Sequence, residues 1–553
     1  MSDVTHTSRS AGVERSANRA PRADTALVVV TIVMALVGTV LRFLPRSGLW
    51  LDEALSVNIS QLPVSEIPDA LRHDGHPPLY YFLLHLWALA GSSDWWIRAL
   101  SGLISVAGIP LAYLAGRRVG RRAVAEGLGG HRVGLIAAAI WSVLPFAVRY
   151  GAETRMYALV STLVLVAYLL LDSLVGDPGR IDRPTSSPWP PAVGLALVTA
   201  LLLYSHYWTL WLGGATALVV LTIGFRALDA ERRRRSWICL GSLAVGVILF
   251  LPWVPTMLYQ SAHTGTPWGE VFRPATILVV TVTDFVGGGF GELQLMSYAL
   301  VIAIAVAVFG TIRTRAGHQV IELVPTPRAR IGAELSVLVL TLAIGWATSA
   351  VASSTYASRY AAAVVPLFVL CSAAGLAMIR TRRATWLATA VVCLALVVGA
   401  GAEIVSDRTQ AGVVVDAIAA DLEATGTPEA LVVACPDQLA PATLRALRQR
   451  GLDVAVVPFP EGDPRFVDWV DYGERNEAAD PAEFVAAALA DADADDRWAV
   501  YAVVNTSYLT FEGKCEGVLA ALGADGAPVE LLVNADADNF FEGMSLWVRR
   551  PNN

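Results

Sequence analysis

Eleven apolar runs, most of them close to the length of a membrane-crossing helix, constrain the fold more than any other feature of this chain. A helix needs about 20 mostly apolar residues to cross the hydrocarbon layer of a bilayer. We therefore predict about eleven transmembrane helices. The runs are 26–44, 97–116, 133–150, 157–174, 192–206, 209–225, 237–254, 293–312, 332–351, 360–378 and 384–402.

The composition supports a polytopic α-helical membrane protein. The 553 residues are 55% hydrophobic and 16% charged, with a mean hydropathy of +0.53, whereas soluble proteins are about 25% charged. Arg, Ala and Val are abundant, and Lys514 is the single lysine, which indicates a GC-rich bacterial genome. Acidic residues prevail after about residue 405, so we expect a soluble appendage there.

Arginine-rich loops indicate which side of the membrane is cytoplasmic. If these loops are cytoplasmic, every other connection is external, the N-terminus is inside and the C-terminus is outside. Because no Ala-x-Ala cleavage pattern precedes the first apolar run, we predict that residues 1–25 are an uncleaved cytoplasmic tail. The basic segments are this tail and 117–132, 226–236, 313–330 and 380–383, together with the less basic loop 175–191.

This orientation requires an odd number of spans between residues 45 and 117, where two apolar runs occur. The run 79–91 is short and contains His85, so we predict an interfacial or re-entrant helix in the first external loop. The same argument applies to 276–291, which contains Asp284 and ends in GGGFG. Eleven spans then remain.

Unusual polar groups gather on the predicted external face. Charges kept at membrane depth usually serve a function, so their presence on one face predicts a site there. The groups are the pair Asp52 and Glu53, RHDGHPPLYY (72–81), RYGAETRMY (149–157), YSHYW (204–208), His263 and YASRY (356–360).

These residue types suit transfer from a lipid-linked phosphate to a hydroxyl. A carboxylate such as Asp52 or Glu53 can take the proton of a hydroxyl as a general base. Arg155 and Arg359 stand where two spans meet the external surface, and the forked guanidinium suits phosphate. A substrate with a phosphate head and a lipid tail would fit such a site.

Each group also has a purely structural interpretation. An acidic pair just after a span can be a solvated boundary, and HPPL can restrain a turn. Arg155 and Arg359 can be interfacial anchors. Tyr204, Tyr207, Trp208 and Trp211 can form an aromatic belt that also accommodates His206.

The order of four motifs resembles the GT-C superfamily of glycosyltransferases, in particular the branch of protein O-mannosyltransferases and lipid A aminoarabinose transferases. The resemblance covers residues 25–165 well, with a weaker echo in SRYAAAVVPLF at 358–368. It implies a polytopic enzyme that uses polyprenyl-phosphate sugars and has juxtamembrane helices in its first external loop. The motifs are LWLDEA, GHPPLYYFLLHLWALAG, WWIRALSGL and RYGAETRMYAL.

The resemblance also implies roles for individual residues. Asp52 would take the acceptor proton, and Glu53 would orient the acceptor or tune Asp52. His76, which stands where the family often has lysine, would bind the donor phosphate together with Arg155 and Arg359. The reaction would be a direct displacement with inversion at the anomeric carbon. Further substrate contacts are expected from Asp74, Tyr80, Arg149, Tyr150, Glu153, Tyr157, His206 and Tyr360.

We expect no cofactor, because no Cys and His spacing typical of zinc is present. A second interpretation is a divalent cation held by carboxylate oxygens of Asp52, Glu53 and Asp74.

Residues 404–553 predict an external α/β domain, after a GT-C-like catalytic domain at 26–403. The segment 429–459 has the pattern of a strand, a helix and a strand, 497–505 is a buried strand, and 513–523 is a helix. PVELLVN and MSLWVRR are further candidate strands, and the alternation favours a mainly parallel sheet. DADADD (491–496) lacks EF-hand spacing and reads as an acidic turn.

Cys435 and Cys515 are the only cysteines of this predicted domain. An external domain permits a disulfide between them, and two buried thiols are the alternative. We find no catalytic pattern in the domain and expect it to bind the acceptor or a partner.

The leading functional prediction is a multi-pass glycosyltransferase of the cell membrane that moves mannose or arabinose from a polyprenyl-phosphate donor on the outer face. Its acceptor would be a glycan, a glycolipid or a protein, with no nucleic acid involved. The resemblance and the GC-rich composition together suggest an actinobacterial source. The alternatives are a lipid-linked glycan transporter, an envelope assembly scaffold, or a degenerate transferase. A transporter should carry polar groups near the midplane or on both faces.

Overall fold

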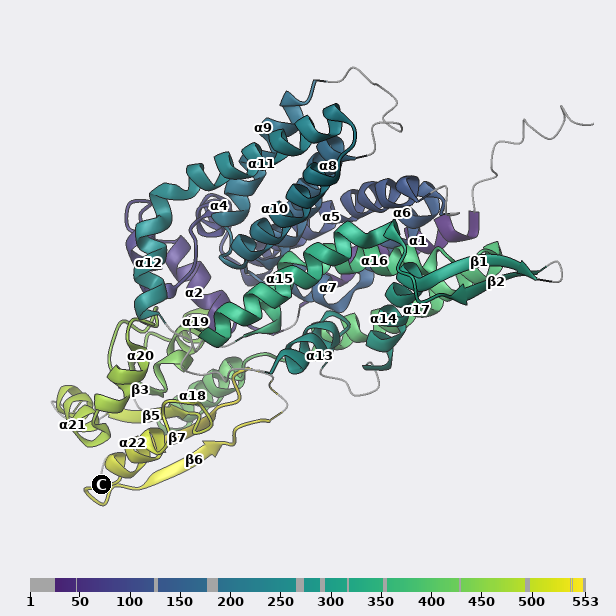
Figure 1. Ribbon diagram of the computed structural model, residues 1–553. Coiled ribbons are helices and arrows are strands. Elements are labelled where there is room, and N and C mark those ends of the chain that lie inside the picture. Colours follow the sequence, from purple (N-terminus) through teal and green to yellow (C-terminus); the bar gives the residue numbers. More distant parts are fainter. Residues whose placement is uncertain are drawn as a thin grey trace, which may run out of the picture.

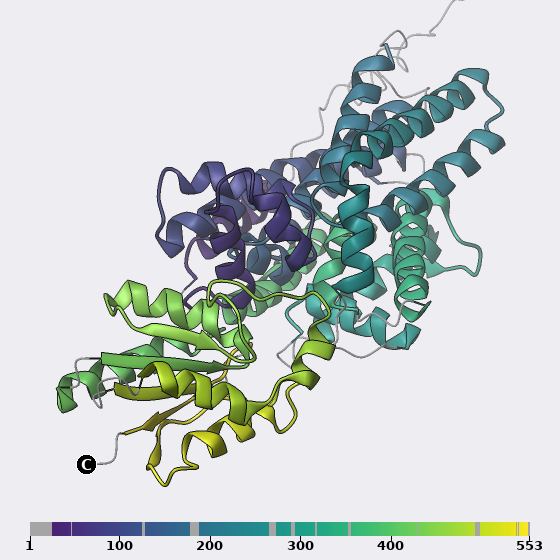
Figure 2. The same cartoon turned by 90° about the vertical axis from the view of Figure 1, so that its left-hand side faces the viewer.

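The computed structural model describes most of the chain, and Figures 1 and 2 show a long helical bundle with an α/β domain packed against one end of it. The predicted tail before residue 25 lies outside the described residues. The described residues are 25–45, 47–123, 128–176, 187–264, 273–288, 294–315, 318–351, 356–426, 429–492, 498–537, 539 and 541–550.

Each of the eleven predicted spans coincides with a helix. The break between α6 and α7 follows from Pro145, which cannot continue the hydrogen-bond ladder of α6 and accompanies a bend of 54°. The helices are α1 (Thr25–Leu41), α5 (Asp94–Arg122), the pair α6 (Gly130–Val143) and α7 (Pro145–Gly151), α8 (Tyr157–Val175), α9 (Trp189–Leu203), α10 (Trp208–Arg226), α11 (Ala230–Phe250), α14 (Gln294–Phe309), α15 (Gly332–Val351), α16 (Val365–Leu376) and α17 (Arg382–Val405).

Their lengths establish a multi-pass protein but leave the number of spans a prediction. Within the described residues, 6 helical segments are long and apolar enough to cross a membrane, and the bent pair of α6 and α7 makes up to 7. Helices α1, α9, α14 and α16 are apolar but shorter, at 17, 15, 16 and 12 residues.

Short helices cap the bundle at the end that faces the α/β domain. They are α2 (Leu51–Ser60), α3 (Ile67–Asp74), α4 (Leu79–Ala88), α12 (Val254–His263) and α13 (Pro274–Phe285). The predicted interfacial segments 79–91 and 276–291 correspond to α4 and α13, of 10 and 12 residues. At about 1.5 Å per residue, neither crosses a 30 Å layer. Gly75, with φ of 83°, ends α3 and turns the chain toward the His76 motif.

A β-hairpin interrupts the helices in the segment that we expected to be only a basic loop. Strands β1 (Gly310–Arg315) and β2 (His318–Leu323) pair antiparallel, and Figure 1 places them far from the α/β domain. The alternation of Thr, Ile and Val with polar residues in this segment is a strand pattern, which the arginine count did not use.

The C-terminal domain contains a five-stranded sheet of order β4-β3-β5-β7-β6. Strand β3 is parallel to β4 and β5, whereas β7 is antiparallel to β5 and β6. The sheet is therefore mixed: β7 alone runs opposite to the other four strands, and the expectation of a mainly parallel sheet was wrong for the two pairings that β7 makes. The elements are α18 (Ala411–Thr425), β3 (Glu429–Cys435), α19 (Ala440–Arg450), β4 (Ala455–Pro458), α20 (Tyr472–Ala478), α21 (Pro481–Ala492), β5 (Trp498–Val504), α22 (Lys514–Leu522), β6 (Val529–Val533) and β7 (Ser545–Arg549).

Helices cover both faces of this sheet, because alternate strand residues point to opposite sides. Val432 and Tyr501 pack in one cluster with residues of α18 and α19. Val433 and Val500 pack in another with residues of α21 and α22. Burial on both faces explains why β3 and β5 read as continuous apolar runs in the sequence.

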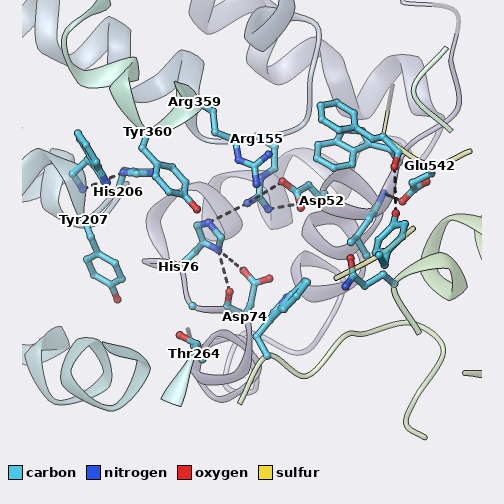
Figure 3. A pocket seen from close by; sticks show the side chains of 18 of the residues that line it. Asp52, Asp74, His76, Arg155, His206, Tyr207, Thr264, Arg359, Tyr360 and Glu542 are labelled. Carbon is cyan, nitrogen blue, oxygen red and sulfur yellow. Dashed lines mark hydrogen bonds and ion pairs between the residues drawn. The ribbon is translucent and has the colours of Figure 1, made fainter. Parts of the chain in front are cut away.

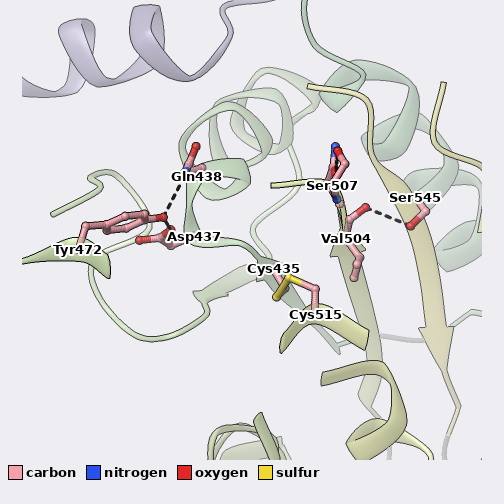
Figure 4. Close-up of a disulfide and its surroundings, with 9 residues drawn as sticks. Cys435, Asp437, Gln438, Tyr472, Val504, Ser507, Cys515 and Ser545 are labelled. Carbon is pink, nitrogen blue, oxygen red and sulfur yellow. Dashed lines mark hydrogen bonds between the residues drawn. A yellow bond between two sulfur atoms is a disulfide. The ribbon is translucent and has the colours of Figure 1, made fainter. Parts of the chain in front are cut away.

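Cys435 and Cys515 form a disulfide, with Cα atoms 5.6 Å apart. Figure 4 shows that the bond joins the end of β3 to α22, beside the loop that carries Ser507. It therefore ties together the two loops that follow the parallel strands β3 and β5.

Candidate functional site

A cavity of about 600 Å³ lies where the helical bundle meets the C-terminal domain. Short helices and interhelical loops line one side of it, and loops of the α/β domain line the other (Figure 3). Seven residues that the sequence predicted for the site lie on its lining. They are Asp52, Asp74, His76, Arg155, His206, Arg359 and Tyr360.

Asp52 is the carboxylate that the cavity can reach. It stands in the first turn of α2, which begins after the extended residue Trp50. Its Oδ2 lies 3.6 Å from Nη2 of Arg155 and has no hydrogen-bond partner among the described residues. An acceptor site for a proton or a hydroxyl is therefore available at this atom.

Glu53, the next residue, does not line the cavity. It is fully buried and accepts hydrogen bonds from Nε and Nη2 of Arg98 at 2.8 and 2.5 Å and from the backbone N–H of Thr154 at 2.8 Å. Burial acts to raise the pKa of Glu53, but the charge and hydrogen bonds of Arg98 outweigh it and lower the pKa. Successive residues of a helix point about 100° apart, so one carboxylate of the pair faces the cavity and the other anchors α2 to α5.

Arg155 is held beside Asp52 by several acceptors. Its Nη1 donates to the hydroxyl of Ser56 at 3.1 Å and to the carbonyl of Asp52 at 3.3 Å. Its side chain is 2% exposed, and its Nε has no hydrogen-bond partner among the described residues. The guanidinium therefore keeps donor capacity for an anion in the cavity.

His76 connects Arg155 to a buried acid. Nε2 of His76 lies 3.1 Å from Nη2 of Arg155, and Nδ1 lies 3.0 Å from Oδ2 of Asp74, as Figure 3 shows. The tyrosine hydroxyl of Tyr81 donates to the same Asp74 oxygen at 2.6 Å. This pattern fits the tautomer in which Nδ1–H donates to Asp74 and Nε2 accepts from Arg155.

Asp74 stays ionised in this chain of contacts. Burial acts to raise the pKa of Asp74, but His76, which donates a hydrogen bond to it, then Arg155 and the Tyr81 hydroxyl, outweigh burial and lower the pKa to about 2. An ionised Asp74 fixes the His76 ring, and the ring in turn positions Arg155.

Arg359 brings a second guanidinium to the same part of the cavity. It lies on the short helix η6 (Ser358–Ala363), and Figure 3 shows it beside Arg155. Tyr360 and His206 complete this side, with ring centroids 5.5 Å apart. Two arginines that reach one cavity from segments far apart in the sequence match a site for a phosphate group.

Six further predicted residues lie behind the cavity lining: Glu53, Tyr80, Arg149, Tyr150, Glu153 and Tyr157. The Tyr80 hydroxyl lies 2.8 Å from that of Ser101. Tyr157 packs against His206 at 5.7 Å between ring centroids, and Tyr150 packs against Tyr157. These residues support the side chains that face the cavity.

Arg149 and Glu153 belong to a buried charge network beneath the C-terminal domain. Arg149 lies within 3.9 Å of carboxylates of Glu153, Asp284 and Glu403. Glu153 also accepts a hydrogen bond from Nη1 of Arg408 at 2.7 Å. Because Arg408 lies at the start of the C-terminal domain, between α17 and α18, this network joins the domain to the bundle.

The lining residues of the C-terminal domain were missed by the sequence analysis. We name this set the C-terminal wall. The sequence does contain a signal that could have identified them: several of these residues closely follow the ends of apolar strands. The wall consists of Gln438, Trp469, Ser507, Tyr508, Leu509, Phe541 and Glu542.

The carboxylates of the divalent-cation site that the sequence suggested are engaged in other contacts. Glu53 is committed to Arg98, and Asp74 to His76 and Tyr81. Among the described residues, no group of three or more His, Cys, Asp or Glu side chains is placed to hold a metal ion.

Comparison with solved structures assigns the chain the fold of the GT-C glycosyltransferases, as the motif resemblance predicted. The crystal structure of ArnT from Cupriavidus metallidurans in the apo state is similar over 95% of this chain and 98% of that chain, with a TM-score of 0.56 and 14% identity. The same protein bound to undecaprenyl phosphate gives a TM-score of 0.52 at 14% identity, with the same coverage.

A mycobacterial structure of the arabinofuranosyltransferase AftD covers 94% of this chain and 40% of that chain, with 18% identity and a TM-score of 0.46. No protein-family model and no curated protein matches the sequence. At these identities the similarity establishes the fold, and the function must be argued from the site.

Proposed function

We propose that this protein is a membrane glycosyltransferase that moves a sugar from a polyprenyl-phosphate donor to an acceptor hydroxyl on the outer face of the cytoplasmic membrane. The observation that carries the proposal is the convergence of Asp52, Arg155 and Arg359 on one cavity. A base beside two guanidinium groups is what such a transfer needs, because a proton must leave the acceptor while negative charge develops on the phosphate.

In the proposed reaction, the acceptor oxygen attacks the anomeric carbon as Asp52 takes its proton. A new bond forms between the acceptor oxygen and the anomeric carbon, and the bond from that carbon to the phosphate oxygen breaks. The electron pair of the broken bond stays on the phosphate, where Arg155 and Arg359 stabilise the charge. Attack opposite the leaving group inverts the anomeric centre.

The fold supports a lipid-linked donor. ArnT, whose fold this chain shares, has been crystallised with undecaprenyl phosphate. The cavity here lies at the end of the helical bundle, between its short capping helices and the C-terminal domain. A lipid tail can remain in the bilayer while its phosphate reaches Arg155. Mannose and arabinose are the sugars that we propose to test first.

The test is the variant Asp52→Asn in purified full-length protein. We measure sugar transfer from a panel of polyprenyl-phosphate mannose and arabinose donors, and binding of the same donors. Loss of a general base should lower turnover by about a hundredfold or more while donor binding stays intact. Asp69→Asn is the matched control, because Asp69 is an exposed carboxylate in the same loop that does not line the cavity.

Two outcomes contradict the proposal. If Asp52→Asn transfers sugar as fast as wild type, Asp52 is not the base. If wild-type protein neither binds nor transfers any donor of the panel, the enzymatic interpretation fails and a non-enzymatic carrier or scaffold must be considered.

A further inference from the structure

The C-terminal wall lies at one edge of the α/β sheet. Gln438 follows β3, Trp469 lies in the segment after β4, and Ser507 follows β5, so all three parallel strands deliver residues from their carboxyl ends. Strand β7 is antiparallel to β5, with Val504 opposite Ser545, so its amino end meets the same edge. This places Phe541 and Glu542 there as well. In open α/β sheets, ligands bind outside the carboxyl ends of the strands.

The chemistry of the C-terminal wall differs from that of the opposite side of the cavity, which the helical bundle forms and which carries Arg155 and Arg359. The wall contains amide, hydroxyl, carboxyl and aromatic groups and no Lys, Arg or His. It therefore has no cation with which to hold a second phosphate or an acidic substrate. Aromatic faces beside neutral hydrogen-bonding groups suit a ligand whose edges carry hydroxyls and whose faces carry C–H groups.

Glu542 shows that the wall holds an unused polar atom. Its side chain is 1% exposed, and its Oε1 accepts a hydrogen bond from the backbone N–H of Leu51 at 2.7 Å. Its Oε2 has no hydrogen-bond partner among the described residues. A buried polar atom without a partner costs stability, so a ligand that supplies the partner is favoured.

Burial raises the pKa of Glu542 to about 8, although contacts with Thr409 and the Leu51 N–H oppose this and the charges of Asp52 and Glu53 add to it. Near neutral pH the carboxyl therefore carries a proton and can donate to a hydroxyl oxygen. Trp50, which stacks on Phe541 with ring centroids 4.1 Å apart, adds a buried Nε1–H that also lacks a partner among the described residues.

The positions of these groups relative to Asp52 select the acceptor as the ligand. Arg155 contacts Asp52 on one side, and Glu542 lies on the other side of Asp52 in Figure 3. There Glu542 accepts a hydrogen bond from the N–H of Leu51, the residue before Asp52. In a displacement with inversion, the incoming oxygen and the leaving phosphate lie on opposite sides of the anomeric carbon. With phosphate at the arginines, the incoming oxygen approaches from the C-terminal wall.

We propose that the C-terminal wall, together with Trp50, is the acceptor subsite and that it binds a carbohydrate, whose hydroxyl lies between Asp52 and Glu542. This inference rests on the proposed function, because it takes the phosphate side as given. Glu542 binds an acceptor hydroxyl, Trp469 covers a sugar face, and Gln438 and Ser507 contact further hydroxyls. The disulfide between Cys435 and Cys515 holds the last two loops in register (Figure 4).

The experiment uses the full-length protein in lipid nanodiscs, with octyl mannopyranoside and octyl arabinofuranoside as acceptors and a Ser/Thr-rich peptide as the competing acceptor class. We measure the KM for acceptor at saturating donor and the KM for donor at saturating acceptor. Glu542→Ala and Trp469→Ala should each raise the acceptor KM by about tenfold, the equivalent of one lost contact of about 1.4 kcal/mol. The donor KM should change by less than about twofold.

Two further variants separate binding from folding. Glu542→Gln keeps the acceptor for the Leu51 N–H and can still donate to a hydroxyl, so it should hold the acceptor KM within about threefold of wild type. Glu530→Ala, at an exposed carboxylate on β6, should leave both KM values unchanged.

The outcomes are distinguishable. Equal rises in donor and acceptor KM, or an unchanged acceptor KM in both alanine variants, would overturn the subsite while leaving the glycosyltransferase proposal in place. Transfer to the peptide but to neither glycoside would also overturn it. If wild type transfers to none of the three and binds no donor, the proposed function itself fails.

Discussion

The two sides of the cavity use different chemistry. The side formed by the helical bundle presents five ionisable residues, Asp52, Asp74, His76, Arg155 and Arg359. Hydrogen bonds or ion pairs link the first four of them, and the charge of Asp52 acts on Arg359. The C-terminal wall presents aromatic rings and neutral polar groups, and its one carboxyl, Glu542, has a raised pKa. Charge is thus concentrated where a phosphate would leave, and the wall is suited to a neutral partner.

This difference suggests how one cavity keeps two substrates apart. A phosphate placed at the C-terminal wall would meet no Lys, Arg or His among the residues of the wall, whereas a neutral sugar at Arg155 and Arg359 would forgo the charge-assisted hydrogen bonds that two guanidinium groups offer a phosphate. Each substrate therefore binds less well at the position of the other. The cavity selects its substrates both by favourable contacts at the correct position and by unfavourable ones at the wrong position.

The largest effect is expected from the charged side. Arg155→Lys keeps a positive charge but loses the forked donor geometry, so we expect transfer to fall on the order of a hundred- to a thousandfold, as for lost transition-state donors. The donor KM should rise and the acceptor KM should not. Arg72→Lys, at an exposed arginine of the same loop, is the control. A rate loss shared equally by Arg72→Lys would remove the distinction between the two sides.

The next effect separates Asp52 from Glu53. Glu53→Gln breaks a buried ion pair with Arg98, which typically costs about 3–5 kcal/mol, so the protein should unfold at a clearly lower temperature. Asp52→Asn should lower the unfolding temperature less, because the Asp52 carboxylate faces the cavity and its contact with Arg155 is longer, at 3.6 Å. Thermal unfolding in detergent measures both.

The double variant Glu53→Gln with Arg98→Met tests the physical reason, because it removes the uncompensated charge and should regain part of the lost stability. If Glu53→Gln retains full stability but loses turnover, Glu53 acts on the substrate, and the structural role assigned to it here is wrong.

A smaller effect should follow from cutting the disulfide that supports the C-terminal wall. The double variant Cys435→Ala with Cys515→Ala releases a link across 80 residues, with a typical stability cost of about 2–4 kcal/mol. Because the loops after β3 and β5 carry Gln438 and Ser507, the acceptor KM should rise severalfold and the donor KM should stay constant. Cys239→Ala, at a buried free cysteine in α11, should change neither KM.

The sequence pointed to the residues that line the charged side of the cavity, because that side is built from local motifs. Asp52, His76 and Arg155 each stand in a short segment next to an apolar run, and their order along the chain matched a family pattern. The motif that contains Arg359 matched the family pattern more weakly, but Arg359 lines the same cavity. Sequence alone did not separate Asp52 from Glu53, since the difference depends on Arg98, which lies 45 residues away and contacts only one of them.

The C-terminal wall could not be predicted in the same way. Its residues come from four loops, and only the strand order brings Gln438, Ser507 and Glu542 to one edge. The strands β3 and β5 were predicted, but the pairing of β7 with β5 was not, and that pairing places Glu542 beside Leu51. The position of Glu542 depends on how strands that are distant in the sequence pair with one another. The hydrophobic periodicity of a single sequence does not contain that pairing.

The smallest effect concerns the segment that positions Trp469. The ring nitrogen Nδ1 of His73 lies 2.9 Å from Oδ1 of Asp468, and the Trp469 N–H donates to the carbonyl of His73. Both side chains of the His73–Asp468 pair are more than a third exposed, at 46% and 40%, so solvent screens the pair and it contributes at most a few tenths of a kcal/mol. The backbone bond survives side-chain replacement. His73→Asn should therefore leave donor KM and unfolding temperature unchanged and raise the acceptor KM by no more than about twofold, measured beside Trp469→Ala. A rise as large as that of Trp469→Ala would mean that the exposed pair, and not the backbone contact, holds the C-terminal wall against the bundle.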